Sequence, residues 1–130
     1  MLQAILVSDD SHQFRGGIVA AIKADARFAK YEIIETSDLE ETLELVMRSI
    51  KGRIGFVLTD FSMGHLRNEG EIVVEISTNP EFNIPTAIMS LNPEDITEAT
   101  KAKCVFVYDK NDDIAPLLDK IHEALGQDCT

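Results

Sequence analysis

Short apolar runs alternate along the chain with longer stretches of helical periodicity. The runs are rich in β-branched residues, and turn or charged residues bound most of them, as is typical of strands. The second run is the most polar, which favours an edge strand, whereas the first, third and fourth resemble strands buried on both faces. The runs are Ala4–Val7, Tyr31–Ile34, Ile54–Leu58, Thr86–Met89 and Cys104–Tyr108.

Each run is followed by a stretch with the pattern of an amphipathic helix. Ser37-Asp38-Leu39-Glu40 has the pattern of a capping box that opens the second helix, and Gly52 ends it. Asn79-Pro80 ends the third helix, and Asn92-Pro93-Glu94-Asp95 indicates the start of the fourth. Gly126 closes the last helix. The faces expected to be buried are Phe14, Ile18, Ala21 and Ile22; Leu39, Leu43, Val46, Met47 and Ile50; Ile72, Val73 and Ile76; and Ile114, Leu117, Leu118, Ile121 and Leu125.

This alternation predicts an α/β fold, a doubly wound (βα)5 unit with a five-stranded parallel sheet of the flavodoxin-like type. With the second strand at an edge, the strand order is 2-1-3-4-5. In such sheets ligands bind beyond the carboxyl ends of the strands, where the winding reverses between strands one and three. We expect residues 1–126 to form this domain and residues 127–130 to be a C-terminal tail.

Composition narrows the class of protein. The 130 residues, 45% hydrophobic and 27% charged, fit one globular domain. A formal charge of -11 disfavours direct binding of nucleic acid. The sequence has no membrane-length apolar run and no signal-peptide pattern, so we expect a cytoplasmic protein that does not bind membranes. Cys104, expected in the core, and Cys129, in the tail, lack the spacing of a zinc site or a disulfide framework.

Polar residues stand at the ends of four of the predicted strands. Asp9 and Asp10 follow the first, Asp60 follows the third, Ser90 ends the fourth and Lys110 follows the fifth. Because the carboxyl ends of parallel strands meet at one edge of the sheet, we expect these side chains to converge on one crevice. Asp10 or Ser90 alone would be interpreted as a helix cap, but five such residues at the correct ends favour a functional site.

The expected chemistry follows from the charges. Three carboxylates repel one another, and Lys110 with one divalent cation balances them; Mg²⁺ suits such oxygen ligands. Asp60 can then act as a nucleophile and form an acyl phosphate. The metal and Lys110 would stabilise charge on the transferred oxygens, and Ser90 would donate a hydrogen bond to the new phosphoryl group.

On these residues the sequence resembles the receiver domains of two-component response regulators, of the stand-alone, single-domain type. Val7-Ser8-Asp9-Asp10 is similar to the acidic pair after the first strand, and Leu58-Thr59-Asp60-Phe61-Ser62-Met63 to the phosphoacceptor segment. Ile84-Pro85-Thr86-Ala87-Ile88-Met89-Ser90 is similar to the fourth strand with its hydroxyl residue, and Lys110 to the lysine of the fifth. The resemblance covers essentially the whole chain.

The resemblance implies a phosphorelay function. Mg²⁺ would bind the side chains of Asp10 and Asp60 and the backbone carbonyl of Ser62, with Asp9 acting through water. Asp60 would accept a phosphoryl group from a sensor histidine kinase or a phosphotransfer protein. Ser90 and the following loop would then move inward and change the surface formed by the fourth helix, fifth strand and fifth helix, where a downstream protein target binds. A homodimer is left open.

Most departures from the family pattern lie near the surface that would change on phosphorylation, rather than among the site residues. Val107 stands where an aromatic switch residue is usual, and Tyr108, the next residue of the strand, faces the other way. Asn111 replaces the usual proline after the lysine, which argues against a cis peptide bond there. Leu91 replaces a small residue, and we expect it to narrow access to Asp60 and to slow reaction with small phosphodonors.

The loop after Asp60 also departs from the pattern. Gly64 replaces a proline, and the segment up to Gly70 is about two residues longer than usual, which predicts a more mobile loop. Of the three histidines, His12 and His122 are interpreted as incidental polar residues. His65, in this loop, is the best candidate for a role near the phosphoryl group.

The leading interpretation is a phosphorylated signalling module, which is not an enzyme because it has no separate substrate. Three alternatives to it remain. The first is a degenerate receiver that acts as an unphosphorylated interaction module. The second is a small Mg²⁺-dependent phosphatase with an aspartyl-phosphate intermediate, for which Asp9-Asp10-Ser11 lacks the D-x-D arrangement expected after the first strand. The third is a flavin- or nucleotide-binding module, which the doubly acidic first loop disfavours.

Overall fold

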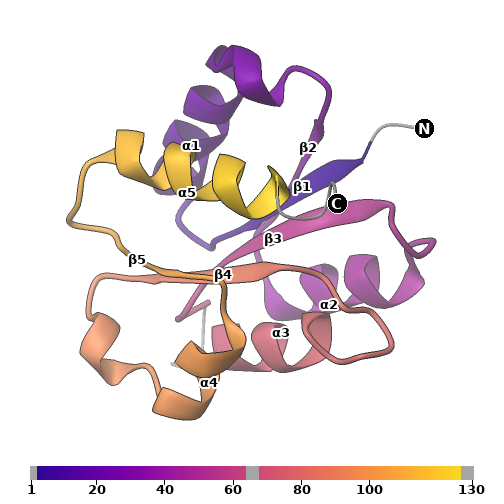
Figure 1. Cartoon of the computed structure of the whole chain (residues 1–130). Coiled ribbons are helices and arrows are strands. Elements are labelled where there is room, and N and C mark those ends of the chain that lie inside the picture. The colour runs from indigo at the N-terminus through magenta and orange to yellow at the C-terminus, as the bar shows by residue number, and fades with distance from the viewer. Residues whose placement is uncertain (1–2, 64–67, 127–130) are drawn as a thin grey trace.

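The computed structural model describes residues 3–63 and 68–126, in which strands and helices alternate (Figure 1). Gly64, His65, the predicted tail at 127–130 and its Cys129 lie outside the described residues. The strands are β1 (Ala4–Ser8), β2 (Glu32–Thr36), β3 (Ile54–Asp60), β4 (Thr86–Ser90) and β5 (Val107–Asp109). The helices are α1 (His12–Ala24), α2 (Leu39–Arg48), α3 (Glu69–Ser77), α4 (Glu98–Lys103) and α5 (Ile114–Gly126), with single 3₁₀ turns η1 (Ala26–Phe28) and η2 (Pro93–Asp95).

The strands of the described chain form one parallel sheet in the order β2-β1-β3-β4-β5. Figure 1 shows α1 and α5 on one face of this sheet and α2, α3 and α4 on the other. The α/β class, the doubly wound arrangement and the strand order predicted from the sequence are therefore confirmed. The winding reverses between β1 and β3, so their carboxyl ends flank the expected binding crevice.

Burial explains why these strands have their sequences. Successive residues of a strand point to opposite faces of the sheet. In β1, Ile5 and Val7 pack with residues of α1 and α5, whereas Leu6 packs with residues of α2 and α3. All residues of β1, β3 and β4 are buried, but in β2 only Thr36 is. The polar second strand is thus the edge strand, as the sequence predicted.

The start of α2 lies one residue later than predicted. Asp38 is the N-cap and accepts a hydrogen bond from the Glu41 N–H (2.7 Å), while the Glu41 carboxylate accepts one from the Ser37 N–H (3.1 Å). The prediction that Met47 and Ile50 lie on the buried face of this helix is wrong, since they are 55% and 71% exposed. Met47 is rotated by one residue from the buried Val46, and Ile50 lies beyond the helix end.

The predicted helix start at Asn92 is also wrong. Pro93–Asp95 forms only the turn η2, and α4 begins at Glu98, where the Thr97 hydroxyl accepts a hydrogen bond from the Thr100 N–H (3.2 Å). Between the two, Ile96 adopts an extended conformation and is buried with Phe61, directly after β3, and with residues of α3 and β4. Burial of this isoleucine interrupts the helix that the local sequence favours.

The fifth strand begins three residues later than predicted, at Val107 rather than Cys104. Cys104 is the C-terminal cap of α4, half-buried against the core, and burial raises the pKa of its thiol to about 12. Val105 already donates its N–H to the Thr86 carbonyl (2.9 Å), so the chain joins the sheet before the strand proper. Cys104 is therefore a packed residue, as expected, but is not in a strand.

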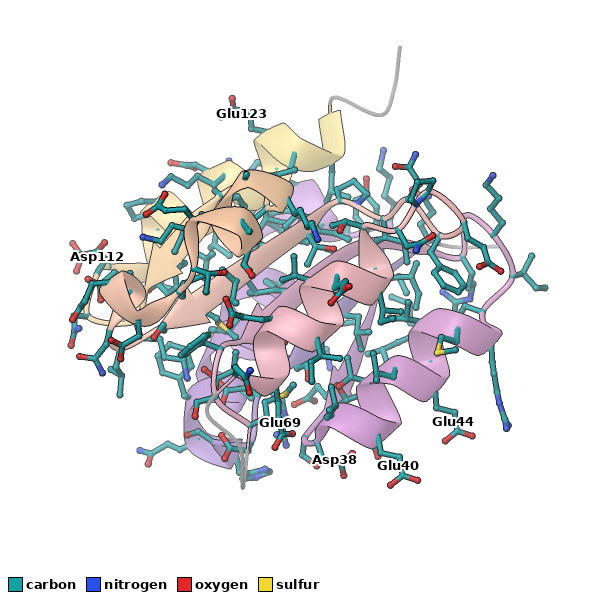
Figure 2. The ribbon with its side chains drawn as sticks, turned by 90° about the horizontal axis from the view of Figure 1, so that it is seen from below. Asp38, Glu40, Glu44, Glu69, Asp112 and Glu123 are labelled. Carbon is teal, nitrogen blue, oxygen red and sulfur yellow. The ribbon has the colours of Figure 1, made fainter. Side chains whose placement is uncertain are left out.

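Many of the acidic side chains lie on the outer surface. Figure 2 shows Glu40 and Glu44 projecting from α2 away from the sheet, and both are exposed. Surface acids of this kind account for much of the formal charge of -11 without forming a site. Within residues 3–63 and 68–126, no helix is long and apolar enough to cross a membrane.

Candidate functional site

The carboxyl ends of β1, β3 and β5 bring two carboxylates and one ammonium group together. Lys110 Nζ lies 2.8 Å from Asp9 Oδ2 and 3.1 Å from Asp60 Oδ1. The Lys110 backbone N–H donates to the Ser90 carbonyl at the end of β4 (2.9 Å), which anchors the base of the lysine. We call Asp9, Asp60 and Lys110 the acid–lysine cluster. The structure thus brings together these three residues, which the sequence placed at separate strand ends.

Asp9 is fully buried, and its surroundings hold it from several sides. Its backbone N–H donates to the Thr36 carbonyl of β2 (3.1 Å), and its Oδ1 accepts from the Ser11 N–H (2.8 Å). Its Oδ2 lies 2.8 Å from the Lys110 ammonium group, which pairs with it. A buried carboxylate oxygen with an ammonium group on one side still has a free lone pair, so a cation or an ordered water there would lower the free energy.

Asp10 adds a third carboxylate at the solvent side. Carboxylate oxygens of Asp9, Asp10 and Asp60 lie within 4.8 Å of one another, with Asp10 exposed and the other two buried. Oxygen ligands at this spacing, open to water on one side, suit Mg²⁺, which keeps several of its waters when bound. The donor set and the under-coordinated Asp9 oxygen therefore fit a hard divalent cation.

Asp60 is a buried acid whose protonation is poised near neutrality. Burial first, and then the charge of Asp9, raise its pKa to about 7, although Lys110 acts in the opposite direction. Two buried carboxylates this close cannot both be charged cheaply with a single ammonium group beside them. A bound cation would favour the ionised form of Asp60, which is the nucleophilic form.

Lys110 remains a cation in this setting. Burial disfavours its charge, but its contacts with Asp9 and Asp60 outweigh that effect and raise its pKa. Its Nζ also lies 4.5 Å from the centre of the Phe14 ring, over the ring face. The sequence pattern had placed Phe14 only in a core stripe, and nothing in that pattern indicates that the ring also supports the lysine through a cation–π contact.

A cleft of about 350 Å³ opens beside the cluster. Ser90 is buried at its wall, and its Oγ accepts a hydrogen bond from the Asn92 N–H (2.9 Å), so that its O–H can still donate to a ligand. Ser62 is exposed and lines the same cleft, so its predicted role as a backbone metal ligand stays a prediction. The lining residues are Asp10, Ser11, Asp60, Phe61, Ser62, Ser90, Leu91, Asn92, Asp95 and Lys110.

Gly70 fixes the backbone that carries Asp60. Its N–H donates to the Phe61 carbonyl (2.9 Å), and the first turn of α3 lies directly against β3. A Cβ at this position would lie 2.0 Å from the Asp60 carbonyl oxygen and 2.7 Å from Phe61 Cα. Only glycine permits this approach. The sequence pattern marked Gly70 merely as the end of a loop.

Val107 and Tyr108, where β5 departs from the family pattern, pack on opposite faces of the sheet. Tyr108 is buried in the core between the sheet and the layer of α1 and α5, and its hydroxyl donates to the Asp112 carbonyl (2.8 Å). Val107 packs on the opposite face, near Phe61 and Ile88. The prediction that Tyr108 faces away from the position of Val107 is confirmed, and the tyrosine is a structural strand residue here.

Leu91 and Asn111 connect the two loops beside the cleft. Leu91 is 60% exposed and lines the cleft, so its effect on access to Asp60 stays a prediction. Asn111 Nδ2 donates to the Leu91 carbonyl (3.1 Å) and to Asp109 Oδ1 (2.8 Å). Within the described residues no peptide bond is cis, as expected with asparagine in place of proline.

The described histidines have ordinary surroundings. His12 begins α1, is exposed, and has its Nδ1 3.2 Å from Arg15 Nη2. His122 lies on α5 with its ring edge-on to Phe28, the ring centres being 6.2 Å apart. The role predicted for His65 concerns a residue outside the described part of the chain.

No family model matches the sequence, and no curated protein is significantly similar to it. Solved structures do match over nearly the whole chain. A DNA-binding response regulator of the LuxR family from Staphylococcus aureus has 19% identity and a TM-score of 0.77, with 95% of this chain and 99% of that chain covered. A response regulator receiver domain protein from Clostridium thermocellum has 22% identity and a TM-score of 0.72, with coverages of 98% and 97%.

A third similar structure is a complex with Mg²⁺-BeF. The response regulator TrrA from Thermotoga maritima, in complex with Mg²⁺-BeF, has 17% identity and a TM-score of 0.72, with 95% of this chain and 99% of that chain covered. Identities this low establish the fold, whereas function depends on the site itself. This chain has the fold of a response-regulator receiver domain.

Proposed function

We propose that this chain is a phospho-accepting receiver whose Asp60 takes a phosphoryl group in a two-component phosphorelay. The observation that carries the proposal is the acid–lysine cluster, in which Lys110 bridges Asp9 and Asp60. Asp10 adds a further carboxylate within the 4.8 Å set. This arrangement lies where the winding of the sheet reverses, which is where doubly wound folds bind ligands.

Asp60 is the proposed nucleophile. One of its carboxylate oxygens attacks the phosphorus of a phosphohistidine on a sensor histidine kinase or a phosphotransfer protein. An O–P bond forms as the N–P bond breaks, and the imidazole nitrogen leaves with the electron pair and takes up a proton. Hydrolysis of the resulting acyl phosphate returns the carboxylate. The chain catalyses only its own modification and is a signalling module.

The remaining site residues act around that reaction. Asp9, Asp10 and Asp60, with the predicted Ser62 carbonyl, would hold Mg²⁺, which supplies positive charge to the transferred oxygens when bound. Lys110, kept charged by its two carboxylates, would pair with the phosphoryl group. Ser90, which lines the cleft, would donate a hydrogen bond to it through its hydroxyl group.

Partners follow from the same proposal. The Mg²⁺-BeF complex of TrrA supports the binding of a divalent cation by a protein of this fold. The modified site would act on a downstream protein through α4, β5 and α5, whose loops meet the cleft. Residues 1–126 would be the receiver unit, located in the cytoplasm with its kinase, and the acidic surface argues against direct contact with nucleic acid.

Incubation with Mg²⁺ and acetyl phosphate, followed by intact-mass measurement, tests the proposal. The parent chain should gain the mass of one phosphoryl group, Asp60→Asn should gain none, and chelation of Mg²⁺ should prevent the gain. Asp113→Asn is the matched control, because it removes an exposed acid outside the cleft lining. It should label like the parent.

Two other outcomes would contradict the proposal in different ways. A parent chain labelled neither by acetyl phosphate nor by phosphorylated histidine kinases would favour the degenerate receiver, which the departures at Val107 and Asn111 also suggest. Continuous release of phosphate from an added phosphate monoester would favour the phosphatase. Measurement of released phosphate in the same reactions separates the two.

A further inference from the structure

Arg15 is a buried arginine on α1 that the proposed chemistry does not use. It is only 9% exposed, although it lies on a helix next to polar residues and two glycines. Arginine is rarely buried unless its guanidinium is paired, since removing a charge from water is costly. The groups that it contacts therefore indicate why it is there.

The guanidinium is held by three groups, from β2, from α1 and from the loop between β1 and α1. Its Nε donates to Glu35 Oε1 on β2 (3.0 Å), and its Nη2 lies 3.2 Å from His12 Nδ1 at the start of α1. Its Nη1 donates to the backbone carbonyl of Asp9, directly after β1, in a short hydrogen bond. A planar guanidinium that reaches three groups at once fixes their relative positions in a way that an ammonium group cannot.

The carbonyl that Arg15 binds belongs to the peptide between Asp9 and Asp10. The N–H of Asp9 donates to the Thr36 carbonyl of β2, so the residue is held on both sides of its backbone. The orientation of that peptide sets the direction in which the Asp10 side chain leaves the chain. Arg15 therefore controls the placement of one carboxylate of the 4.8 Å set relative to the other two.

We propose that Arg15 is a positioning residue that sets the geometry of the Asp9–Asp10 pair for a divalent cation, an inference that rests on the proposed function. Geometry and charge make opposite predictions here. Replacing a cation next to an acidic site by a neutral residue would strengthen cation binding if charge alone mattered. If the hydrogen bond to the Asp9 carbonyl matters more, the same replacement weakens binding.

Titration calorimetry of the unphosphorylated chain with Mg²⁺ alone tests this inference. Arg15→Gln should weaken Mg²⁺ affinity about 10- to 100-fold, the usual effect of losing a group that orients a metal ligand. Arg15→Lys retains the buried charge and most of the volume but lacks the planar fork, and it should also weaken affinity. Thermal unfolding of each variant without metal shows whether the fold is intact.

Arg53→Gln is a matched control. Arg53 also pairs with a glutamate of β2, Glu32, but at the opposite end of the strand from Glu35. The substitution Arg53→Gln should lower the stability of the fold without changing its Mg²⁺ affinity. Should Arg15→Gln not fold, Arg15→Lys decides the matter by the same measurement.

The outcomes separate this inference from the proposed function. A parent chain that binds Mg²⁺, with folded Arg15 variants that bind it as tightly or more tightly, would overturn the positioning role and leave the proposed function standing. A parent chain that binds no Mg²⁺ would overturn both. Weakened binding in both Arg15 variants but not in Arg53→Gln would support the role.

Discussion

Two regions at the carboxyl ends of the strands differ sharply in how they are held. In the acid–lysine cluster of Asp9, Asp60 and Lys110, every side chain is almost fully buried and ion pairs join the three. Beside it lie the β4–α4 loop and the part of the β5–α5 loop after Lys110, here called the loop pair. The loop pair is largely exposed and is joined through Leu91 and Asn111. Burial and ion pairs hold the acid–lysine cluster in place, whereas a few exposed hydrogen bonds hold the loop pair.

Under the proposed function, the difference suits the two regions to separate tasks. Chemistry requires charged groups held at fixed distances, which a buried cluster provides. A response to phosphorylation requires a segment with low local stability, and exposed hydrogen bonds near a cleft provide that. The departures from the receiver pattern at Leu91 and Asn111 fall in the loop pair and leave the three residues of the acid–lysine cluster unchanged. Under the proposed function we expect them to affect the response and the access to Asp60.

The largest expected effect concerns the backbone under the cluster. Gly70→Ala would place a Cβ 2.0 Å from the Asp60 carbonyl oxygen, so α3 or β3 must shift. We expect the free energy of unfolding to fall by about 3 kcal/mol, the upper part of the range for overpacked sites. Chemical denaturation measures this change, and phosphorylation from acetyl phosphate should also slow because Asp60 is displaced.

Gly16→Ala is the matched control for that substitution. Gly16 lies within α1, and a Cβ there would meet no atom within 4 Å. Alanine should raise stability by about 1 kcal/mol through its higher helix propensity. Equal effects of the two substitutions would show that the close approach at Gly70 does not constrain Asp60.

The second effect is a pH dependence of the free energy of unfolding that arises from Asp60 in the acid–lysine cluster. The pKa of Asp60 is raised to about 7 from 3.8, so the folded chain binds a proton that the unfolded chain releases between these values. Its contribution to stability is therefore complete below about pH 4 and is lost as the pH rises through 7. From pH 5 to 8 the loss should be about 3 kcal/mol.

Asp60→Asn removes that titration and isolates it. Denaturation of the parent and variant at pH 5 and pH 8, without metal, gives the difference in stability at each pH. The variant should gain on the parent as the pH rises, and addition of Mg²⁺ at pH 8 should stabilise only the parent. If the difference in stability between parent and variant did not change with pH, the neighbours of Asp60 would not raise its pKa.

Much of this arrangement could be predicted from the sequence because it depends on local patterns. Burial on both faces makes β1, β3 and β4 continuous apolar runs, and strict alternation with helices then determines a parallel sheet. Once the strand order is known, Asp9, Asp60 and Lys110 must lie at the same edge, without any knowledge of side-chain packing.

The errors and omissions depend on contacts between distant segments. The helix expected at Asn92 is interrupted because Ile96 is buried against residues of other elements. The supporting contacts of Phe14, Arg15 and Gly70 appear only when α1 and α3 are packed on the sheet. Periodicity identifies which face of a helix is buried, but it does not show what the buried face contacts.

The third effect tests the connection within the loop pair. Asn111→Ala removes the hydrogen bonds to the Leu91 carbonyl and to Asp109 Oδ1, at a cost of about 1 kcal/mol. Hydrogen exchange should become faster at the Asn92 amide, which the Ser90 hydroxyl now protects, but not at the Phe61 amide of the cluster side. Asn79→Ala, which removes a loop hydrogen bond at the other end of the sheet, is the control. Faster exchange at Phe61 as well would show that the two regions are not separate.

The smallest expected effect is kinetic and concerns Leu91. Its exposed side chain lines the cleft beside Asp60, so we expect it to restrict the entry of small molecules. Leu91→Ala should speed both labelling by acetyl phosphate and hydrolysis of the acyl phosphate by less than about tenfold, since one exposed side chain changes a barrier by less than about 1.4 kcal/mol. Val105→Ala, an exposed apolar residue away from that cleft, should leave both rates unchanged. Unchanged rates in Leu91→Ala would mean that access is controlled elsewhere, whereas faster labelling with unchanged hydrolysis would mean that Leu91 hinders the phosphodonor but not water.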